Sequence, residues 1–154
     1  KDMNKTVPRN FNEVVEILNQ FIEEKKLRKT PERFYILEEI YSRDDHFEAE
    51  MLYNDIIKKK FNLSKATVYN TLELFIECKL IKKHQFGNNF AQYEKSYGYK
   101  QHDHLICIEC NKVFEFCDPR IQNIKQTMGD IMHFKVMNHS LTLYAHCDKK
   151  ECKT

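Results

Sequence analysis

Two close pairs of cysteines constrain this chain more than any other feature. Two residues separate Cys107 from Cys110, and Cys147 and Cys152 form a second pair further along the chain. A two-residue spacing lets both sulfurs reach one tetrahedral ion, and the second pair can complete its coordination. The spacing predicts a closed structural zinc site with four thiolate ligands. A redox dithiol, or cysteines that only pack as small apolar residues, are the alternatives.

Length and composition indicate a small protein of one or two domains. The chain has 154 residues and six cysteines, and no apolar run reaches membrane-spanning length. Residues 1–6 lack the apolar stretch of a secretory signal, so we expect a cytoplasmic protein with reduced thiols and no membrane partner. Cys78 and Cys117, outside the two pairs, are expected to pack as small apolar residues.

The overall charge does not point to a nucleic-acid partner. The formal net charge is only +2, and Lys and Arg balance Asp and Glu over residues 1–94. A protein of this kind that binds DNA must do so through locally clustered cations.

Before residue 78, apolar residues recur at the spacing of four helices. Thr30 followed by Pro31, and Ser64, mark two helix starts. We expect the third helix to run from about Glu48 to Lys60 and the fourth to follow after residues 61–63. The expected inward positions are Phe11, Val14, Val15, Leu18, Phe21 and Ile22; Phe34, Ile36, Leu37 and Ile40; Met51, Leu52, Ile56 and Ile57; and Val68, Leu72, Phe75 and Ile76.

Two strand-like segments follow the helices. Residues 80–86 and 90–94 flank a Gly-Asn-Asn turn at 87–89, which predicts a hairpin. Helices, a short turn, another helix and a hairpin make a winged helix-turn-helix, which we assign to residues 1–94 as a DNA-binding domain.

In such a domain the helix after the turn enters the major groove. Its exposed start offers Lys65 for a phosphate, Thr67, Tyr69 for a phosphate or a thymine methyl, and Asn70 for adenine. Each residue also has a plain interpretation, because Tyr and Asn at a helix start are often half-buried or capping and Lys65 alone would be a solvated charge. Their combination on the second helix of a turn favours double-stranded DNA as the partner.

Residues 95–154 predict a small α+β domain. Residues 103–108 and 112–117 suggest a hairpin, Pro119 permits a helix through Ile131, and residues 135–144 suggest a third strand. Zinc could supply part of the folding free energy of so small a unit, of order 10 kcal/mol for structural sites. An exposed sheet edge would favour dimerisation.

A second metal signal is His102-Asp103-His104. On a strand, residues two apart face the same side, so both imidazoles can reach one ion while Asp103 points away. A nitrogen and oxygen shell without thiolate suits Fe(II), Mn(II), Co(II) or Zn(II). Surface histidines without metal are the plain alternative. The candidate partners of these histidines are His46, Glu94 and Glu115.

Together, four segments resemble the ferric uptake regulator family over nearly the whole chain. They are Ala66-Thr67-Val68-Tyr69, His102-Asp103-His104-Leu105-Ile106-Cys107-Ile108-Glu109-Cys110, Lys112-Val113-Phe114-Glu115-Phe116 and Asn138-His139-Ser140-Leu141. The resemblance implies a homodimeric repressor with an N-terminal winged-helix domain and a C-terminal dimerisation domain. It also implies Fe(II) as corepressor at AT-rich inverted repeats before iron-acquisition genes.

The resemblance also assigns sites position by position. Arg28 and Arg33 match contacts to the DNA backbone and minor groove, where a narrow A-tract attracts cations. The structural zinc ligands would be Cys107, Cys110, Cys147 and Cys152, and the regulatory metal ligands His46, Glu94, His102, His104 and Glu115.

The chain departs from the family pattern at a third metal site. Asp103 and His139 match two of its four ligands, but Gln101 and Gln122 replace a His and a Glu. Two neutral ligands are weak, so we expect this site to be doubtful or empty.

Further departures bear on the branch of the family. Asn70 replaces an Arg of many iron sensors and matches the peroxide-sensing branch, so the operator can differ from the usual iron box. The peroxide sensors have Asp where this chain has Glu94 and Glu115, which favours iron sensing. Zinc or manganese sensing is a further alternative within the family.

The sequence gives little support to two enzyme classes. A zinc hydrolase could use His102, His104 and Glu115, but neither a nucleophile nor a phosphate loop supports it. A thiol oxidoreductase could use Cys107 and Cys110, but such pairs usually open a helix, whereas this pair lies in an expected hairpin. We expect that the protein is not an enzyme.

Overall fold

The computed structural model describes residues 11–86, 91–98 and 101–147. By its internal contacts the chain divides into unit 1, residues 1–99, and unit 2, residues 100–154. The hairpin of unit 1 continues past Glu94, and the Ser96 N–H donates to the carbonyl of Leu80 at 3.1 Å. Among the described residues, no helix is both long and apolar enough to cross a membrane.

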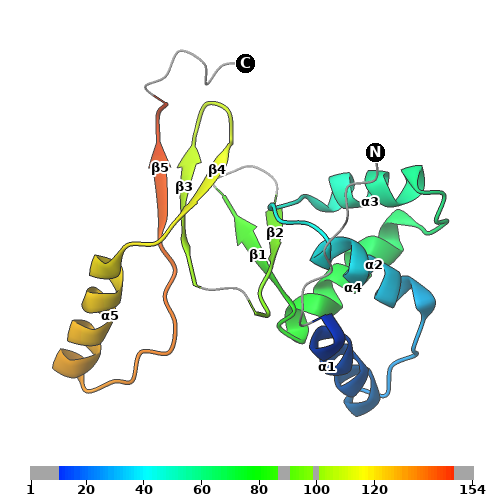
Figure 1. Ribbon diagram of the computed structural model, residues 1–154, viewed down its shortest axis with the longest axis horizontal. Helices are drawn as coiled ribbons and strands as arrows, with labels where there is room; N and C mark the ends of the chain where they lie inside the picture. Colours follow the sequence, from blue (N-terminus) through cyan, green and yellow to red (C-terminus); the bar gives the residue numbers. More distant parts are fainter. Residues whose placement is uncertain (1–10, 87–90, 99–100, 148–154) are drawn as a thin grey trace. The chain divides into compact units, whose positions relative to one another are not determined.

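Unit 1 is a winged helix-turn-helix, as expected. Thr30 lies at the N-cap of the second helix with Pro31 in its first turn, although the Thr30 side chain makes no capping hydrogen bond. Ser64 Oγ caps the fourth helix by accepting from the Thr67 N–H at 3.1 Å. The elements are α1 (Phe11–Glu24), α2 (Pro31–Tyr41), α3 (Ala49–Lys58), α4 (Lys65–Glu77), β1 (Ile81–Gln85) and β2 (Ala91–Lys95), drawn in Figure 1.

The core of unit 1 forms where the apolar stripes of the four helices meet the hairpin. Val14, Leu18 and Ile22 of α1 are buried at a spacing of four residues, which is one face of a helix. The hydroxyl of Tyr41, at the end of α2, donates to the Leu80 carbonyl at 2.6 Å and ties that helix to the start of β1. The hairpin is therefore held against the helices at a defined position.

The expected inward set of α3 is wrong at two positions. Leu52 and Ile56 are fully buried, but Met51 is 44% and Ile57 is 38% exposed. Only the stripe that begins at Ala49 faces the core, because a ten-residue surface helix can present one narrow face to its neighbours.

Replacing Phe75 with alanine should cost unit 1 about 3–5 kcal/mol of unfolding free energy, the range for truncating a buried aromatic residue. Phe75 is fully buried in α4. Urea unfolding followed by circular dichroism would measure the loss. Ile57→Ala is the matched control and should cost under about 1 kcal/mol, as surface changes usually do. Equal losses for the two variants would contradict the packing described here.

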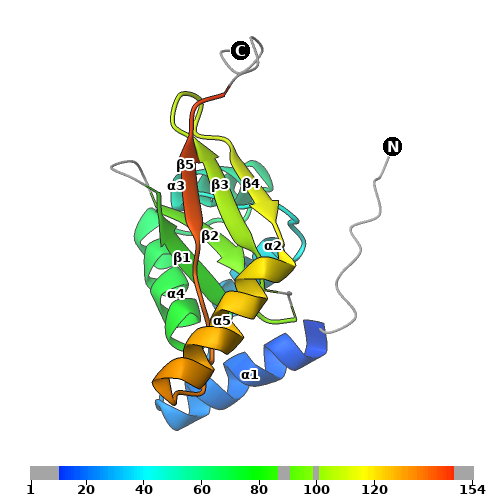
Figure 2. The same cartoon turned by 90° about the vertical axis from the view of Figure 1, so that its left-hand side faces the viewer.

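Unit 2 combines a three-stranded sheet with one helix. Its elements are β3 (Asp103–Cys107), β4 (Val113–Phe116), α5 (Pro119–Met132) and β5 (Thr142–Ala145). The strand order is β4-β3-β5, with β3 antiparallel to β4 and parallel to β5. A parallel pair needs a crossover connection, which α5 supplies. Figure 2 shows the three strands side by side in this order.

The last strand is shorter than expected. Residues 135–141 form no strand, and β5 begins at Thr142. One backbone bond, from the His104 N–H to the Leu141 carbonyl at 3.1 Å, extends the pairing of β3, and side chains also bind the backbone here. Asn138 Oδ1 accepts from the His139 N–H at 2.9 Å, and Asp103 Oδ1 accepts from the Leu141 N–H at 3.2 Å.

Unit 2 exposes many large apolar side chains. In α5 only Gly129 is buried, whereas Ile131 is 62% and Met128 is 47% exposed. We define the apolar surface of unit 2 as Ile124, Met128, Ile131, Met132, Phe134, Val136, Met137, Leu143 and Tyr144. Exposed apolar area on this scale usually marks an interaction site.

Candidate metal and DNA-binding sites

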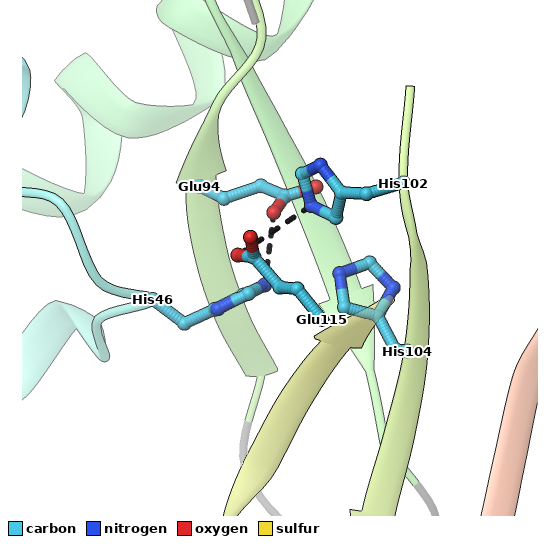
Figure 3. A group of neighbouring side chains, drawn as sticks. All are labelled: His46, Glu94, His102, His104 and Glu115. Atoms are coloured by element: carbon cyan, nitrogen blue, oxygen red, sulfur yellow. Dashed lines mark ion pairs between the residues drawn. The ribbon is translucent and has the colours of Figure 1, made fainter. Parts of the chain in front are cut away.

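In unit 1, backbone pairing brings His46 and Glu94 together. The Phe47 N–H donates to the Tyr93 carbonyl at 3.0 Å, and the Tyr93 N–H donates back to Phe47 at 2.8 Å. His46 and Glu94 flank this pair, and His46 Nε2 lies 2.8 Å from Glu94 Oε2. Figure 3 shows the imidazole directed at the carboxylate. Both side chains are more than nine-tenths buried, so the carboxylate requires such a partner.

A buried lysine fixes the segment that carries His46. Lys95 ends β2 beside Glu94, and its side chain is 5% exposed. Its ammonium donates to the carbonyls of Arg43 and Tyr41 and lies 3.6 Å from Asp44 Oδ1. The same strand thus supplies the Glu94 carboxylate and anchors the loop before His46.

The histidine of β1 also reaches Glu94, and sequence reasoning missed it. His84 Nε2 lies 2.7 Å from Glu94 Oε1. The strand register places Lys82 opposite Glu94 and His84 opposite Gln92, so His84 and Glu94 are diagonal neighbours on one face. Pairing residues 80–86 with 90–94 across the turn could have found this contact.

In unit 2, His102 and His104 lie beside Glu115. His104 and Glu115 face each other in the β3–β4 register, and His102 Nε2 is 3.5 Å from Glu115 Oε1. The ligand atoms of the three residues lie within 4.8 Å of one another. Figure 3 shows both imidazoles on the same side of the strand. Asp103 instead accepts from the backbone of Leu141, which confirms the expected alternation of the His-Asp-His segment.

The donor chemistry of both groups fits a divalent transition metal. His46 with Glu94, and His102 with His104 and Glu115, offer imidazole nitrogens and carboxylate oxygens without thiolate. Such a set suits Fe(II), Mn(II), Co(II) or Zn(II), which differ mainly in preferred geometry and availability.

Three of the four cysteines of the expected zinc site lie near the end of the sheet of unit 2 where β3 and β5 finish. Cys107 ends β3 and is paired in register with Ala145, two residues before Cys147. The Asn111 N–H donates to the Cys107 carbonyl at 2.9 Å, which closes a tight turn around Cys110. Parallel strands end at the same edge, so this arrangement fits the expected ligand set. The fourth expected ligand, Cys152, lies outside the described residues.

The other two cysteines differ from each other. Cys78 lies at the end of α4, where burial raises the pKa of its thiol to about 11, and its Sγ lies 3.6 Å from the Phe75 carbonyl. It is a protonated, unreactive packing residue, as expected. The same expectation is wrong for Cys117, which is exposed because it follows the outer strand β4.

At the doubtful third metal site, Asp103 and His139 form a hydrogen-bonded pair. Asp103 Oδ1 lies 3.1 Å from His139 Nε2, and the Gln101 side chain donates to the His139 carbonyl at 2.7 Å. Gln122 and Cys117 line the same cavity. The Gln101 amide nitrogen is thereby committed to the backbone. A donor set with only Asp103 and His139 as good ligands fits a resident metal poorly.

The start of α4 presents the expected DNA-contacting residues. Tyr69 is 44% exposed and Asn70 is exposed beside it. Lys65 Nζ lies 2.7 Å from Glu50 Oε1, and this hydrogen bond raises the pKa of the Lys65 ammonium. Thr67 Oγ1 is 2.8 Å from Ser64 Oγ, so its hydroxyl supports the helix cap. Arg33, in the first turn of α2, donates to the carbonyl of Arg28, and these two residues lie together.

Comparisons with known proteins agree over most of the chain. The model of the ferric uptake regulator family matches residues 24–144. The ferric uptake regulation protein of Haemophilus ducreyi is 38% identical over 114 residues, which are 70% of this chain and 76% of the relative. That of Escherichia coli is 33% identical over 136 residues, or 88% and 91% of the two chains.

Solved structures share the same fold. The ferric uptake regulator of Helicobacter pylori, described as having three functional metal-binding sites, aligns with a TM-score of 0.80 at 26% identity and covers 93% of each chain. The regulator of Pseudomonas aeruginosa with manganese aligns with a TM-score of 0.74 at 27% identity, over 85% of this chain and 98% of the other.

These matches span both units, and they explain why a winged helix and a histidine-rich and cysteine-rich sheet occur in one chain. They also confirm the expectation that the protein is not an enzyme, because the matched proteins are transcription regulators. The chain belongs to the ferric uptake regulator family.

Proposed function

We propose that the protein is an Fe(II)-responsive transcriptional repressor. It acts in the cytoplasm as a homodimer on AT-rich inverted repeats before iron-acquisition genes. The observation that carries this proposal is that each unit contributes an incomplete set of nitrogen and oxygen ligands. Two come from the winged-helix unit and three from the other unit. We propose that one ion would join them as the regulatory shell His46, Glu94, His102, His104 and Glu115.

Ligands from both units give a direct mechanism for metal control. Bound Fe(II) would supply a common Lewis acid for imidazoles and carboxylates that belong to different units. His46 and Glu94 belong to unit 1, which also contains α4, whereas His102, His104 and Glu115 belong to unit 2. An ion that binds only when both sets converge favours the arrangement in which the recognition helices of a dimer match successive major grooves.

The apolar surface of unit 2 supports dimerisation. Ile131 and Phe134 are 62% and 72% exposed, which is costly for a surface that stays in water. In addition, β5 is an edge strand of the sheet, with one side unpaired within the described part of unit 2. A second copy of the chain would cover both features, and the two-fold symmetry of the dimer would match an inverted repeat.

We propose a structural role for zinc at the four cysteines. The site would close the end of the sheet where Cys107 is paired with Ala145, two residues before Cys147. Zinc held by four thiolates has no open position, so it stabilises unit 2 without taking part in sensing. Asp103 and His139 form a hydrogen-bonded pair, and we propose no resident metal there.

Lys65→Ala should weaken binding to all DNA sequences by a similar factor and reduce the salt slope by about one unit. The reason is that Lys65 is exposed at the N-terminus of α4, where its ammonium can neutralise a phosphate that replaces its partner Glu50. Fluorescence anisotropy at several salt concentrations would measure both quantities.

Glu50→Gln is the matched control for Lys65. It removes the carboxylate that holds the ammonium at 2.7 Å and should raise affinity for all sequences. Loss of affinity confined to the preferred operator in Lys65→Ala would instead make Lys65 a base-reading residue.

Selection from a random duplex pool tests the operator and the choice of metal. Protein with Fe(II) should enrich AT-rich inverted repeats, and protein with chelator should enrich none. Enrichment that depends on Mn(II) or Zn(II) alone would make the protein a sensor of that metal instead of Fe(II).

Brief exposure to peroxide tests the peroxide-sensing alternative. A peroxide sensor would lose Fe(II)-dependent DNA binding after this treatment. Glu94 and Glu115, in place of aspartates, favour retention of DNA binding.

A further inference from the structure

Glu94 is held by two imidazoles rather than one. Its Oε2 lies 2.8 Å from His46 Nε2, and its Oε1 lies 2.7 Å from His84 Nε2. The Glu94 side chain is 8% exposed and that of His84 is 17% exposed. Each carboxylate oxygen is therefore engaged by a different ring within unit 1. Only His46 belongs to the proposed regulatory shell, so the role of His84 is open.

The position of His84 is fixed by the hairpin and by stacking. In the β1–β2 register it lies diagonally across from Glu94 on the same face. Its ring is parallel to that of Phe86, with an interplanar angle of 4° and centroids 5.3 Å apart. Phe86 is 7% exposed. Its ring also contacts that of His46 edge-on, with the two ring centroids 6.3 Å apart. One aromatic ring thus limits the movement of both imidazoles that contact the carboxylate.

We propose that His84 is a positioning residue for Glu94, acting on metal affinity without binding the metal itself. This inference rests on the proposed function. The Nε2–H of His84 donates to Oε1 and orients Oε2 towards His46, so that Oε2 and His46 Nε2 are presented together to the ion. Hydrogen bonds to ligating carboxylates orient them, and removing such a partner typically weakens metal binding by about 10–100-fold.

Co(II) binding to protein that already contains zinc tests this role. His84→Ala should raise the Co(II) dissociation constant by about 10-fold or more and leave the d–d absorption bands unchanged, because the ligands themselves are retained. His84→Gln should restore most of the affinity, since a glutamine amide can donate to Oε1 from nearly the position of Nε2. Thermal unfolding of each variant would show that unit 1 remains folded.

Unchanged affinity in folded His84→Ala would overturn the proposal. So would a change in the d–d bands that His84→Gln does not reverse, because that result would make His84 a ligand. Gln92→Ala is the matched control, since Gln92 lies opposite His84 in the register, and it should bind Co(II) normally. His102→Ala distinguishes failure of the proposed regulatory shell from failure of the role given to His84. If His102→Ala binds Co(II) as tightly as the unmodified protein, the proposed shell is wrong. If His102→Ala weakens Co(II) binding and His84→Ala does not, only the role of His84 is overturned.

Discussion

Cys107→Ser should release zinc and unfold unit 2, which makes it the most damaging single substitution we expect. Cys107 is buried at the end of the central strand β3, and losing one of four thiolates should forfeit most of a binding free energy of order 10 kcal/mol. That energy exceeds what a sheet with a largely exposed helix can replace. Dimer formation should fail with it, because the apolar surface of unit 2 depends on this fold.

Zinc content and size-exclusion chromatography with light scattering would measure both effects. Cys117→Ser is the matched control, because Cys117 is exposed and belongs to neither cysteine pair. It should keep zinc and the dimer. A stable, zinc-containing dimer of Cys107→Ser would count against a structural site built from the four thiolates.

His102→Ala should leave zinc and the dimer intact but abolish Fe(II)-dependent DNA binding. His102 supplies one of the imidazoles grouped within 4.8 Å in unit 2 and is not part of the core. Losing a ligand should weaken Fe(II) binding by more than the roughly 100-fold upper range for the loss of an outer partner. The coupling of metal to DNA, typically about 1–3 kcal/mol in allosteric proteins, should then disappear.

Anisotropy titrations of His102→Ala with and without Fe(II), together with its zinc content, would test this expectation. His133→Asn is a suitable control, because His133 has a φ of 58° at the end of α5 and asparagine tolerates that conformation. It should retain Fe(II) dependence. Unchanged Fe(II) dependence in His102→Ala would remove His102 from the sensor.

Local chemistry made much of the fold predictable. Pro31 after Thr30, and Ser64 with its side chain on the Thr67 N–H, each started a helix where expected. Hydrophobic periodicity predicted all five helices of the described chain. The four helices of unit 1 bury apolar residues in its core, whereas α5 leaves its large apolar side chains exposed. The alternation of His102, Asp103 and His104 on a strand was likewise confirmed.

Features that depend on packing could not be predicted from periodicity, and those that depend on register need an explicit pairing of the two strands. Met51 and Ile57 are apolar, but which stripe of α3 faces the core depends on neighbours distant in sequence. The contact of His84 with Glu94 depends on hairpin register, and the anchoring of the Arg43 carbonyl by Lys95 joins a loop to a strand far along the chain. Periodicity carries no information about such pairs.

Anaerobic fluorescence anisotropy of an AT-rich inverted-repeat duplex tests the central claim most directly. The protein would be titrated with Fe(II), with Mn(II), Zn(II) and chelator as comparisons. The account predicts tight binding that appears with Fe(II) and reverses with chelator. Equal binding in chelator, or no binding with any of the metals, would contradict an Fe(II)-activated repressor.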